Sequence, residues 1–380
     1  MEILDKKRRV FVLGGGISKF AAERVDGNMR DWMNEAVIEA LEDSGTRIED
    51  IEHSTTSYFS DHFDKQLKAG AIFHDNIGMC PKPNVRVEGG GGTGGLAIRN
   101  AYAYIMSGLC DSMIVFGGEN MGRHVPSSVA QQFIALASDT DWEVQVAGFY
   151  IAYYAMMMTA HMDTYGTKEE QFATISVKNH RNAMTNPKAH YPMDITVEDV
   201  MNSKMITYPY KLLDNCLLSD GAACLVFSTA EWAEKHAKSW GAKPTIELVG
   251  TGCGTDFMRM ADRPFPDPGI THFRGKQFGS QQAYKMAGIK HPREDLDCYG
   301  STTPTPAWSS SATRTWASAS RARAASWPRR ACSTSAATCP PTPRAGSSGS
   351  GTRSAPPGSR RALRFCASSA RRSTPGARWS

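Results

Sequence analysis

The chain has 380 residues, of which 41% are hydrophobic, and a formal net charge of +5. This length allows two or three domains and a large buried core. All 38 acidic residues lie in residues 1–300, which carry a net charge of −8, whereas residues 301–380 carry 13 arginines and no acidic residue. The net positive charge of the chain therefore comes from residues 301–380 alone. No recognition motif accompanies it, so we expect no nucleic-acid partner.

The sequence gives no sign of secretion, membrane insertion or a disulfide framework. Its opening residues lack the apolar centre of a signal peptide, and the most apolar run, Val146–Met158, is shorter than the roughly 20 residues of a membrane span. The nine cysteines include no CxxC pair, which is typical of a reduced chain without a zinc site. We therefore expect a cytoplasmic protein with no membrane contact and no metal.

The first elements are a strand and a helix. Val10–Leu13 reads as a strand that is followed by three glycines, and apolar residues recur at helical spacing from Met29 to Leu41. Gly45 is expected to end this helix. A stripe of this kind is most often core, so we assign it no function.

The stretch Val85–Gly108 predicts a short strand, a glycine-rich turn and a helix. Such a turn lets the backbone approach a ligand, and the start of a helix offers unpaired N–H groups with partial positive charge. It is therefore a candidate site for an anion or a developing oxyanion. The glycine spacing matches neither a dinucleotide nor a phosphate-binding-loop motif. On these residues alone, an ordinary glycine-rich turn explains the pattern equally well.

A buried strand is predicted at Ser112–Phe116, followed by an inserted loop region over about 122–165. The helix Phe149–Met162 within it is rich in tyrosine and methionine, which suits an acyl pocket, a dimer contact or ordinary core. Thr167–Glu170 reads as a capping box that opens a helix reaching about Met184.

The elements predicted after residue 217 weakly repeat those predicted at the start of the chain. A strand is predicted to end the segment Leu217–Phe227, a helix follows at 230–240, and the strand Ile246–Val249 precedes further glycines. The similarity between RVFVLGGG and TIELVGTGCG suggests two βαβ halves whose central helices pack together.

The turn resembles that of the thiolase superfamily, especially its sterol-carrier-protein-type and archaeal members. Their strand–turn–helix reads Val-Glu-x-x-Cys-x-Ser-Gly-Gly, and this chain matches it at Val87, Glu88, Gly94 and Gly95. The resemblance implies an α/β thiolase fold with two similar βαβαβ-type halves and buried central helices in five layers. Residues 1–230 would form the N-terminal half, and residues 231–300 would begin the C-terminal half.

The same resemblance implies the site residues. The acyl-accepting cysteine of the family falls at Gly91, which has no side chain to acylate. Gly92, Thr93 and Gly94 would bind substrate or oxyanion at the helix start. Thr93 stands where the family has serine.

A second family segment falls at Leu296-Asp297-Cys298, where relatives have His-Asp-Cys/Ala-Phe or Asn-Glu-Ala-Phe. The His or Asn helps to form an oxyanion hole, and Leu296 cannot donate a hydrogen bond. We retain Asp297 and Cys298 as catalytic candidates. Cys298 is either a reactive thiol or a buried structural cysteine.

Residues 301–380 are rich in Ser, Ala, Arg, Thr and Pro and hold one Leu and one Phe. As written, this segment cannot bury enough apolar surface to fold, so we expect it to be disordered. Codons built across neighbouring residues permit Asn-x-x-Gly-Gly within 339–349 and Gly-His-Pro within 350–358, the thiolase C-terminal signature. We therefore interpret the segment as a shifted reading frame; a natural basic tail is the alternative. The family's catalytic histidine is absent as written, since none follows His291.

The resemblance implies cleavage or formation of a carbon–carbon bond in an acyl-CoA, with coenzyme A as substrate and no covalently bound cofactor. It is strongest to large subunits of the benzoylsuccinyl-CoA thiolase type, which act in aromatic degradation. It therefore implies a homodimer and a small zinc-ribbon/OB-fold partner subunit. Two alternatives remain: a cysteine-free retro-aldolase that acts on a β-hydroxyacyl-CoA with a tyrosine or histidine base, and a non-catalytic thiolase-fold partner subunit.

Overall fold

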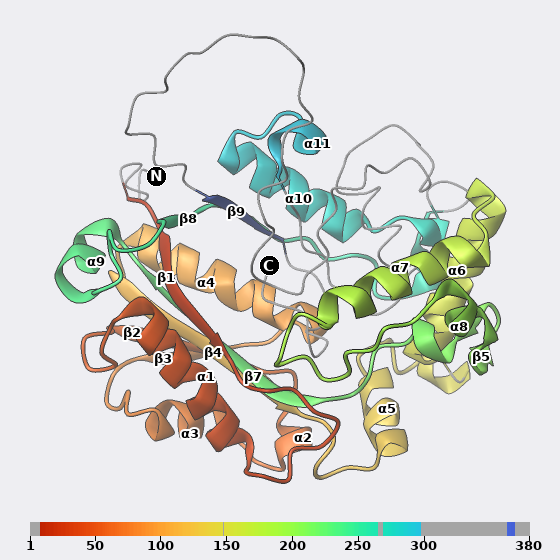
Figure 1. The fold of residues 1–380 in the computed structure, drawn as a ribbon, viewed down its shortest axis with the longest axis horizontal. Coiled ribbons are helices and arrows are strands. Elements are labelled where there is room, and N and C mark those ends of the chain that lie inside the picture. The colour runs from red at the N-terminus through yellow and green to blue at the C-terminus, as the bar shows by residue number, and fades with distance from the viewer. Residues whose placement is uncertain (1–7, 147, 265–268, 298–362, 369–380) are drawn as a thin grey trace.

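The computed structural model describes residues 8–146, 148–264, 269–297 and 363–368. Seven strands form one mixed sheet in the order β3-β2-β4-β7-β1-β8-β9, and β5 pairs with β6 (Figure 1). The strands are β1 Phe11–Ile17, β2 His53–Ser57, β3 Asn84–Val87, β4 Ser112–Asn120, β5 Met205–Thr207, β6 Tyr210–Lys211, β7 Asp220–Ser228, β8 Ile246–Gly252 and β9 Leu363–Ser368. The α-helices are α1 Met29–Ser44, α2 Asp61–Asp64, α3 Ala69–Asn76, α4 Thr93–Ser107, α5 Ser127–Ala135, α6 Tyr150–Tyr165, α7 Glu169–Ala183, α8 Val197–Asn202, α9 Ala230–His236, α10 Arg274–Ala287 and α11 Pro292–Asp295.

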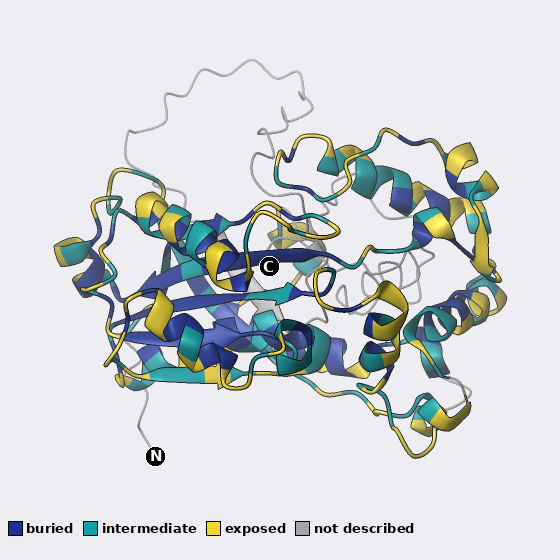
Figure 2. Ribbon diagram, turned by 90° about the horizontal axis from the view of Figure 1, so that it is seen from below, coloured by how far each residue is buried: buried dark blue, intermediate teal, exposed yellow. Residues whose placement is uncertain are grey.

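The centre of the sheet is buried between two helices, α1 on one face and α4 on the other (Figures 1 and 2). Side chains alternate between the faces of a strand. On β4, Ile114 and Phe116 accordingly pack with α1, whereas Met113 and Val115 pack with α4. The first half is therefore a three-layer unit with the sheet between α1 and α4.

The weak sequence repeat suggested two strand–helix units. They are β1 with α1 and β8 with α10, and in both the strand packs against the helix through glycine residues. A side-chain carbon on Gly14 would lie 2.9 Å from the carbonyl oxygen of Ala40 in α1, and one on Gly250 would lie 2.6 Å from that of Ala283 in α10. Any Cβ at these positions would collide with the backbone of the covering helix. The strands consequently continue through their glycines to Ile17 and Gly252. The predicted ends at Leu13 and Val249 are corrected, because close packing and not a turn requires these glycines.

The segment 301–380, expected to be disordered as written, contributes six described residues. They form β9, which pairs in parallel with β8 from Ile246↔Leu363 to Gly252↔Ser368. A strand edge offers a row of unpaired N–H and C=O groups, which explains why an extended segment adds there. This corrects the expectation for Leu363–Ser368. The other residues of the segment 301–380 lie outside the described part of the chain, so the reading-frame interpretation stays a prediction.

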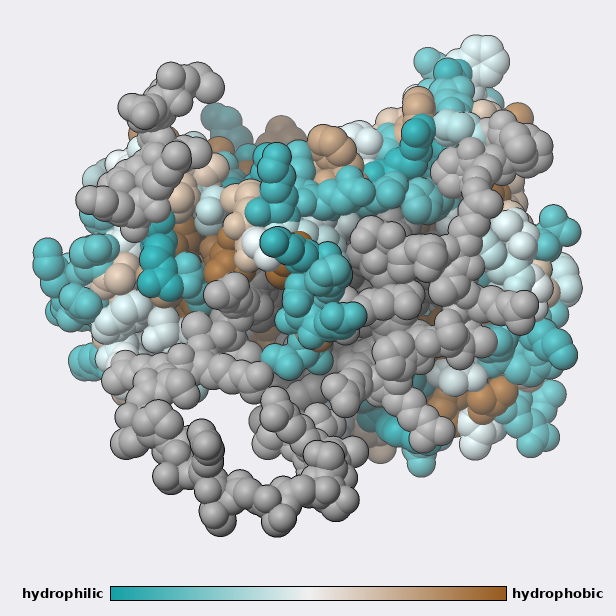
Figure 3. Space-filling view, turned by 90° about the horizontal axis from the view of Figure 1, so that it is seen from above, coloured by the Kyte–Doolittle hydropathy of each residue, from teal (hydrophilic) through white to brown (hydrophobic). Residues whose placement is uncertain are grey.

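Two described helices, α5 and α6, fill most of the predicted insertion. They lie beyond one end of the sheet, next to α7 and α8 (Figure 1). The face of the molecule seen from the side of α10 and α11 is largely hydrophilic where described residues are visible, with smaller apolar areas between (Figure 3). Within the described ranges, the helices are all too short or too polar to cross a membrane.

Candidate active site

The glycine turn between β3 and α4 forms part of the wall of a cavity of about 620 Å³. A 3₁₀ turn, Gly90–Gly92, leads directly into α4, and Gly91 and Gly92 both line the cavity. The first N–H groups of a helix have no partner within the helix and carry partial positive charge. Within the turn the N–H of Gly92 donates to the carbonyl of Gly89 at 3.0 Å and that of Thr93 to the carbonyl of Gly90, so the N–H of Gly91, which lines the cavity, is the group suited to stabilise an anionic oxygen there.

The backbone distinguishes neighbouring glycines in this turn. Gly90 has a φ of 59°, a conformation that favours glycine, whereas Gly91 is not among the residues with positive φ. The conformation at Gly91 would therefore accept an L side chain. The backbone gives no reason for glycine at the position of the family's cysteine.

Thr93 closes the turn with its side chain. Its hydroxyl donates to the carbonyl of Gly90 at 2.6 Å and accepts the N–H of Gly89 at 3.1 Å. Neither Thr93 nor Gly94 lines the cavity. The structure thus gives Thr93 a role in shaping the turn, and substrate binding by Thr93 and Gly94 stays a prediction.

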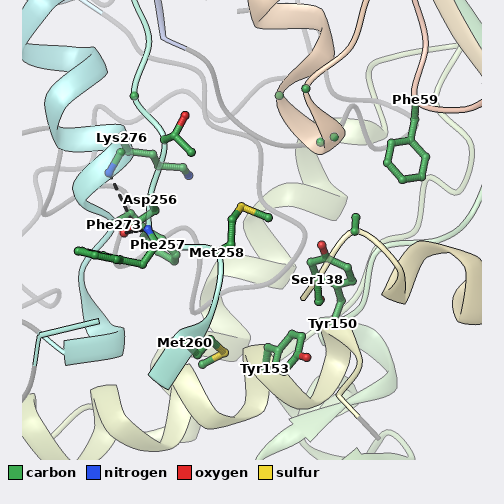
Figure 4. Close-up of a pocket in the computed structure, with 18 of the residues that line it drawn as sticks. Phe59, Ser138, Tyr150, Tyr153, Asp256, Phe257, Met258, Met260, Phe273 and Lys276 are labelled. Atoms are coloured by element: carbon green, nitrogen blue, oxygen red, sulfur yellow. Dashed lines mark hydrogen bonds between the residues drawn. The ribbon is translucent and has the colours of Figure 1, made fainter. Parts of the chain in front are cut away.

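One wall of the cavity is aromatic and comes mainly from the inserted region (Figure 4). The lining side chains there are Phe59, Phe133, Tyr150, Tyr153, Tyr154 and Met157. The helix predicted to be rich in tyrosine and methionine therefore does line a pocket. Burial is the main cause that raises the pKa of Tyr153, so its phenol stays protonated at neutral pH. The hydroxyl oxygen itself is buried next to Gly148.

The facing wall is built by the loop after β8 and the start of α10. It includes Cys253–Met258, Arg263, Phe273 and Lys276. The carboxylate of Asp256 accepts the N–H of Phe257 at 3.0 Å and that of Gly275 at 3.4 Å, which ties the loop to the helix (Figure 4). Sequence reasoning missed this wall. The only available signal was its position directly after the second glycine-rich strand.

The structure does not bring Leu296 or Asp297 of the second predicted segment to the cavity. Leu296 caps the carboxyl end of α11, Asp297 is exposed, and neither lines the cavity. The cavity lies at the amino end of α10, and α11 follows its other end, about 20 Å away for a helix of 14 residues. Cys298 lies outside the described residues. The catalytic assignments of these residues stay predictions.

Histidine, the expected general base, is missing from this site. All ten histidines lie in described parts of the chain, and none lines the cavity. His53 is instead buried in β2 and His74 in α3. As written, the cavity therefore holds neither a cysteine at the helix start nor a histidine base.

The fold and this site define a member of the thiolase family. The family described as "Thiolase, N-terminal domain" matches residues 14–209, and the chain belongs to it. It is 40% identical over 298 residues to the acetyl-CoA acetyltransferase of Methanothermobacter thermautotrophicus, in a match that covers 77% of this chain and 74% of that protein. The predicted resemblance to archaeal thiolases is confirmed.

Two further similarities extend this comparison. The chain is 30% identical over 246 residues to benzoylsuccinyl-CoA thiolase subunit BbsB of Thauera aromatica, covering 64% of this chain and 60% of that protein. The solved Ltp2-ChsH2(DUF35) aldolase has a TM-score of 0.68 at 23% identity, over 82% of this chain and 78% of that chain. The α/β thiolase fold predicted from the sequence is confirmed.

Proposed function

We propose that this chain acts on an acyl-CoA by cleaving or forming a carbon–carbon bond, with an aromatic acyl group such as benzoylsuccinyl as substrate. The observation that carries the proposal is the cavity at the amino end of α4, which faces an aromatic wall. Its volume of about 620 Å³ lies within the range of roughly 300–1,000 Å³ that ligand sites occupy. The similarity to subunit BbsB supports the aromatic substrate.

The residues present support binding and polarisation of a thioester. The backbone N–H of Gly91 would bind the carbonyl oxygen as it gains negative charge, whereas the N–H of Gly92 already donates to the carbonyl of Gly89 at 3.0 Å. Acyl transfer also needs a nucleophile, which this family places at Gly91, so we infer that a complete thiolase cycle requires a cysteine there.

A retro-aldol reaction is the second candidate, because it needs no acyl-accepting side chain. A base removes the proton of the β-hydroxyl group, the carbon–carbon bond breaks, and its electrons form an enolate on the thioester that is then protonated. Gly91, the tyrosines of the cavity wall and the similarity to a protein named as an aldolase favour this candidate.

Coenzyme A dependence separates these reactions. The purified chain and its Gly91→Cys variant are incubated with benzoylsuccinyl-CoA or a β-hydroxyacyl-CoA, with and without free coenzyme A. Product formation that requires both the cysteine and coenzyme A supports the thiolase reaction. Cleavage by the unaltered chain without coenzyme A supports the aldolase. Tight substrate binding without any product supports a non-catalytic partner subunit.

We further propose a homodimer in the cytoplasm that associates with a small zinc-ribbon/OB-fold subunit. β3 is an edge strand of the sheet, so its outer edge can pair with a second copy. BbsB is named as a subunit, and the similar aldolase is named together with ChsH2. Light scattering of the purified chain tests the dimer, and co-purification with a zinc-containing small subunit tests the heteromeric complex.

A further inference from the structure

The two walls of the cavity are joined to each other by a hydrogen bond. The carboxylate of Glu143, from the inserted region, accepts the backbone N–H of Met260, from the loop after β8, at 2.6 Å. Both residues line the cavity. A hydrogen bond to a charged acceptor is stronger than one between neutral groups. The loop after β8 is thus fastened to the opposite wall.

Arg259 forms a second connection beside the first. Its Nε atom lies 4.0 Å from the Oδ2 atom of Asp139, and its guanidinium carbon lies 5.7 Å from the centre of the Trp142 ring. The same Nε donates to Asp262 of its own loop at 2.7 Å, which orients the guanidinium. Ion pairs and cation–π contacts at exposed positions are individually weak. This connection can therefore break and re-form without any change in the core.

The segment on the inserted side is folded on itself. The carboxylate of Asp139 accepts the N–H of Trp142 at 2.9 Å, and its carbonyl accepts the N–H groups of Glu143 at 3.0 Å and Val144 at 3.1 Å. These bonds fix the carboxylates of Asp139 and Glu143 on one short stretch of backbone. The inserted side is therefore a firm surface for the other loop to close against.

The loop after β8 presents apolar side chains at the mouth of the cavity. Phe257 and Met258 line the cavity, yet they are 45% and 53% exposed. Met258 lies between the wall that carries Asp256 and the wall that carries Ser138 (Figure 4). Side chains that line a cavity and also meet solvent stand at its entrance. Their position decides how wide a ligand can enter.

We propose that residues 257–262 form a gate over the mouth of the cavity, which Glu143 and Arg259 hold shut. Opening breaks the hydrogen bond to Met260 and the contacts of Arg259 with the inserted side, and it withdraws Phe257 and Met258 from the mouth. A ligand that is too wide for the closed mouth then enters, and the same contacts re-form behind it. The gate acts on any ligand of the cavity, so it does not depend on the proposed function.

Cys253 reports the opening, because it lines the cavity, whereas Cys80 is exposed and Cys110 and Cys224 are buried. The full chain is treated with iodoacetamide or with the much larger fluorescein maleimide, and peptide mass spectrometry gives the rate at each cysteine. Glu143→Leu should speed modification of Cys253 by the larger reagent about tenfold, as expected for the loss of one hydrogen bond to a charged acceptor. The rate with iodoacetamide should change less, because a small reagent needs a smaller opening.

Arg259→Met is the second variant, and its weaker contacts predict a gain of about two- to fivefold with the larger reagent. Each variant has a matched control. Asp141→Ala removes an exposed carboxylate two residues before Glu143, and Arg30→Met removes an exposed arginine of α1. Both controls should leave the rate at Cys253 unchanged. Hydrogen exchange at the Met260 amide should also be faster in Glu143→Leu, because its acceptor is gone.

Rates at Cys253 that neither variant changes would overturn the gate. So would faster modification of Cys110 and Cys224 together with Cys253, because the whole molecule would then have loosened. Neither reagent is a coenzyme A compound. Failure of the proposed function would therefore leave this result as it stands.

Discussion

Gly252 of β8 lies so close to Gly279 of α10 that a methyl group on Gly252 would overlap the carbonyl oxygen of Gly279. Gly16 of β1 has the same relationship to Ala36 of α1. The two halves of the fold thus pack in the same way. At a glycine of the strand, the backbone of the helix that follows it comes into direct contact with the strand.

The first prediction concerns this packing. Gly16→Ala and Gly252→Ala should each lower the free energy of unfolding by about 2 kcal/mol or more, because overpacking typically costs about 1–3 kcal/mol and here the obstacle is backbone. Gly70→Ala in α3 is the control, since its added carbon would meet Thr56 at 3.4 Å in ordinary contact. It should be neutral or stabilising by up to about 1 kcal/mol. Urea denaturation measures all three, and equal stability would contradict the packing.

The second prediction concerns the hydroxyl of Thr93. Thr93→Val removes two hydrogen bonds within the turn, so it should cost about 1–3 kcal/mol of stability. Thr159→Val also removes a hydroxyl, but from the exposed side of α6, where it bonds only to the carbonyl of Ala155. That control should change stability by less than about 0.5 kcal/mol. Similar losses in both variants would show that Thr93 does not hold the turn.

The third prediction concerns a thiol at the amino end of α4. In the Gly91→Cys variant, the helix start should lower the pKa of the introduced thiol, so iodoacetamide should modify it faster than the exposed Cys80. The introduced side chain should also carry the acyl group as a covalent adduct, which mass spectrometry detects as a mass increase after incubation with an acyl-CoA.

Gly90→Cys is the matched control for that experiment. Its φ of 59° strains an L residue, so this variant should lose about 1–2 kcal/mol of stability. Gly91→Cys should keep the stability of the unaltered chain. Modification at position 91 no faster than at Cys80 would show that the helix start does not activate a thiol.

The fourth prediction concerns pH and His74. Its Nε2–H donates to the carbonyl of Lys82 at 2.9 Å, so its Nδ1 accepts the hydroxyl of Ser54 at 2.8 Å and the ring is neutral. Burial is the main cause that lowers the pKa of His74 in the folded state. The unfolded state therefore binds more protons below about pH 6.5, and stability is lost as the pH falls from there toward the folded pKa.

His74→Gln should reduce the fall in the urea midpoint between about pH 7.5 and about pH 5.5, which span the ordinary pKa of histidine. The fall should not vanish, because burial also lowers the pKa of His53. His124→Gln is the control, because it removes an exposed histidine that forms none of these hydrogen bonds. An unaltered slope in His74→Gln would contradict the assignment of a neutral buried ring.

Elements whose own side chains form the core were predictable. The stripe from Met29 to Leu41 corresponds to α1, and Gly45 ends this helix in the left-handed conformation as expected. The predicted capping box at Thr167 is wrong in detail. The side chain of Gln171 accepts the N–H of Lys168 at 2.8 Å, so the cap begins one residue later.

Elements that depend on distant partners could not be predicted. β2 is buried along its whole length although every residue in it is polar, so it lacks an apolar pattern. Its polar groups are bonded by other elements: Asn84 of β3 donates to Ser54 at 2.6 Å and to Thr56 at 2.8 Å. The glycine turn could be predicted because its residues are neighbours in the sequence. The facing wall with Lys276 could not. Its residues meet the turn only once the chain has folded.

The interlock of α10 with β8 has a consequence for the evolution of ligand choice. A carbon on Gly254 would collide with the backbone of Gly275, which is the residue before Lys276. The helix therefore cannot slide along the strand, and its first turn is held at a fixed depth beside the cavity. A larger residue at either glycine would move the first turn of α10 and so change the width of the cavity beside it.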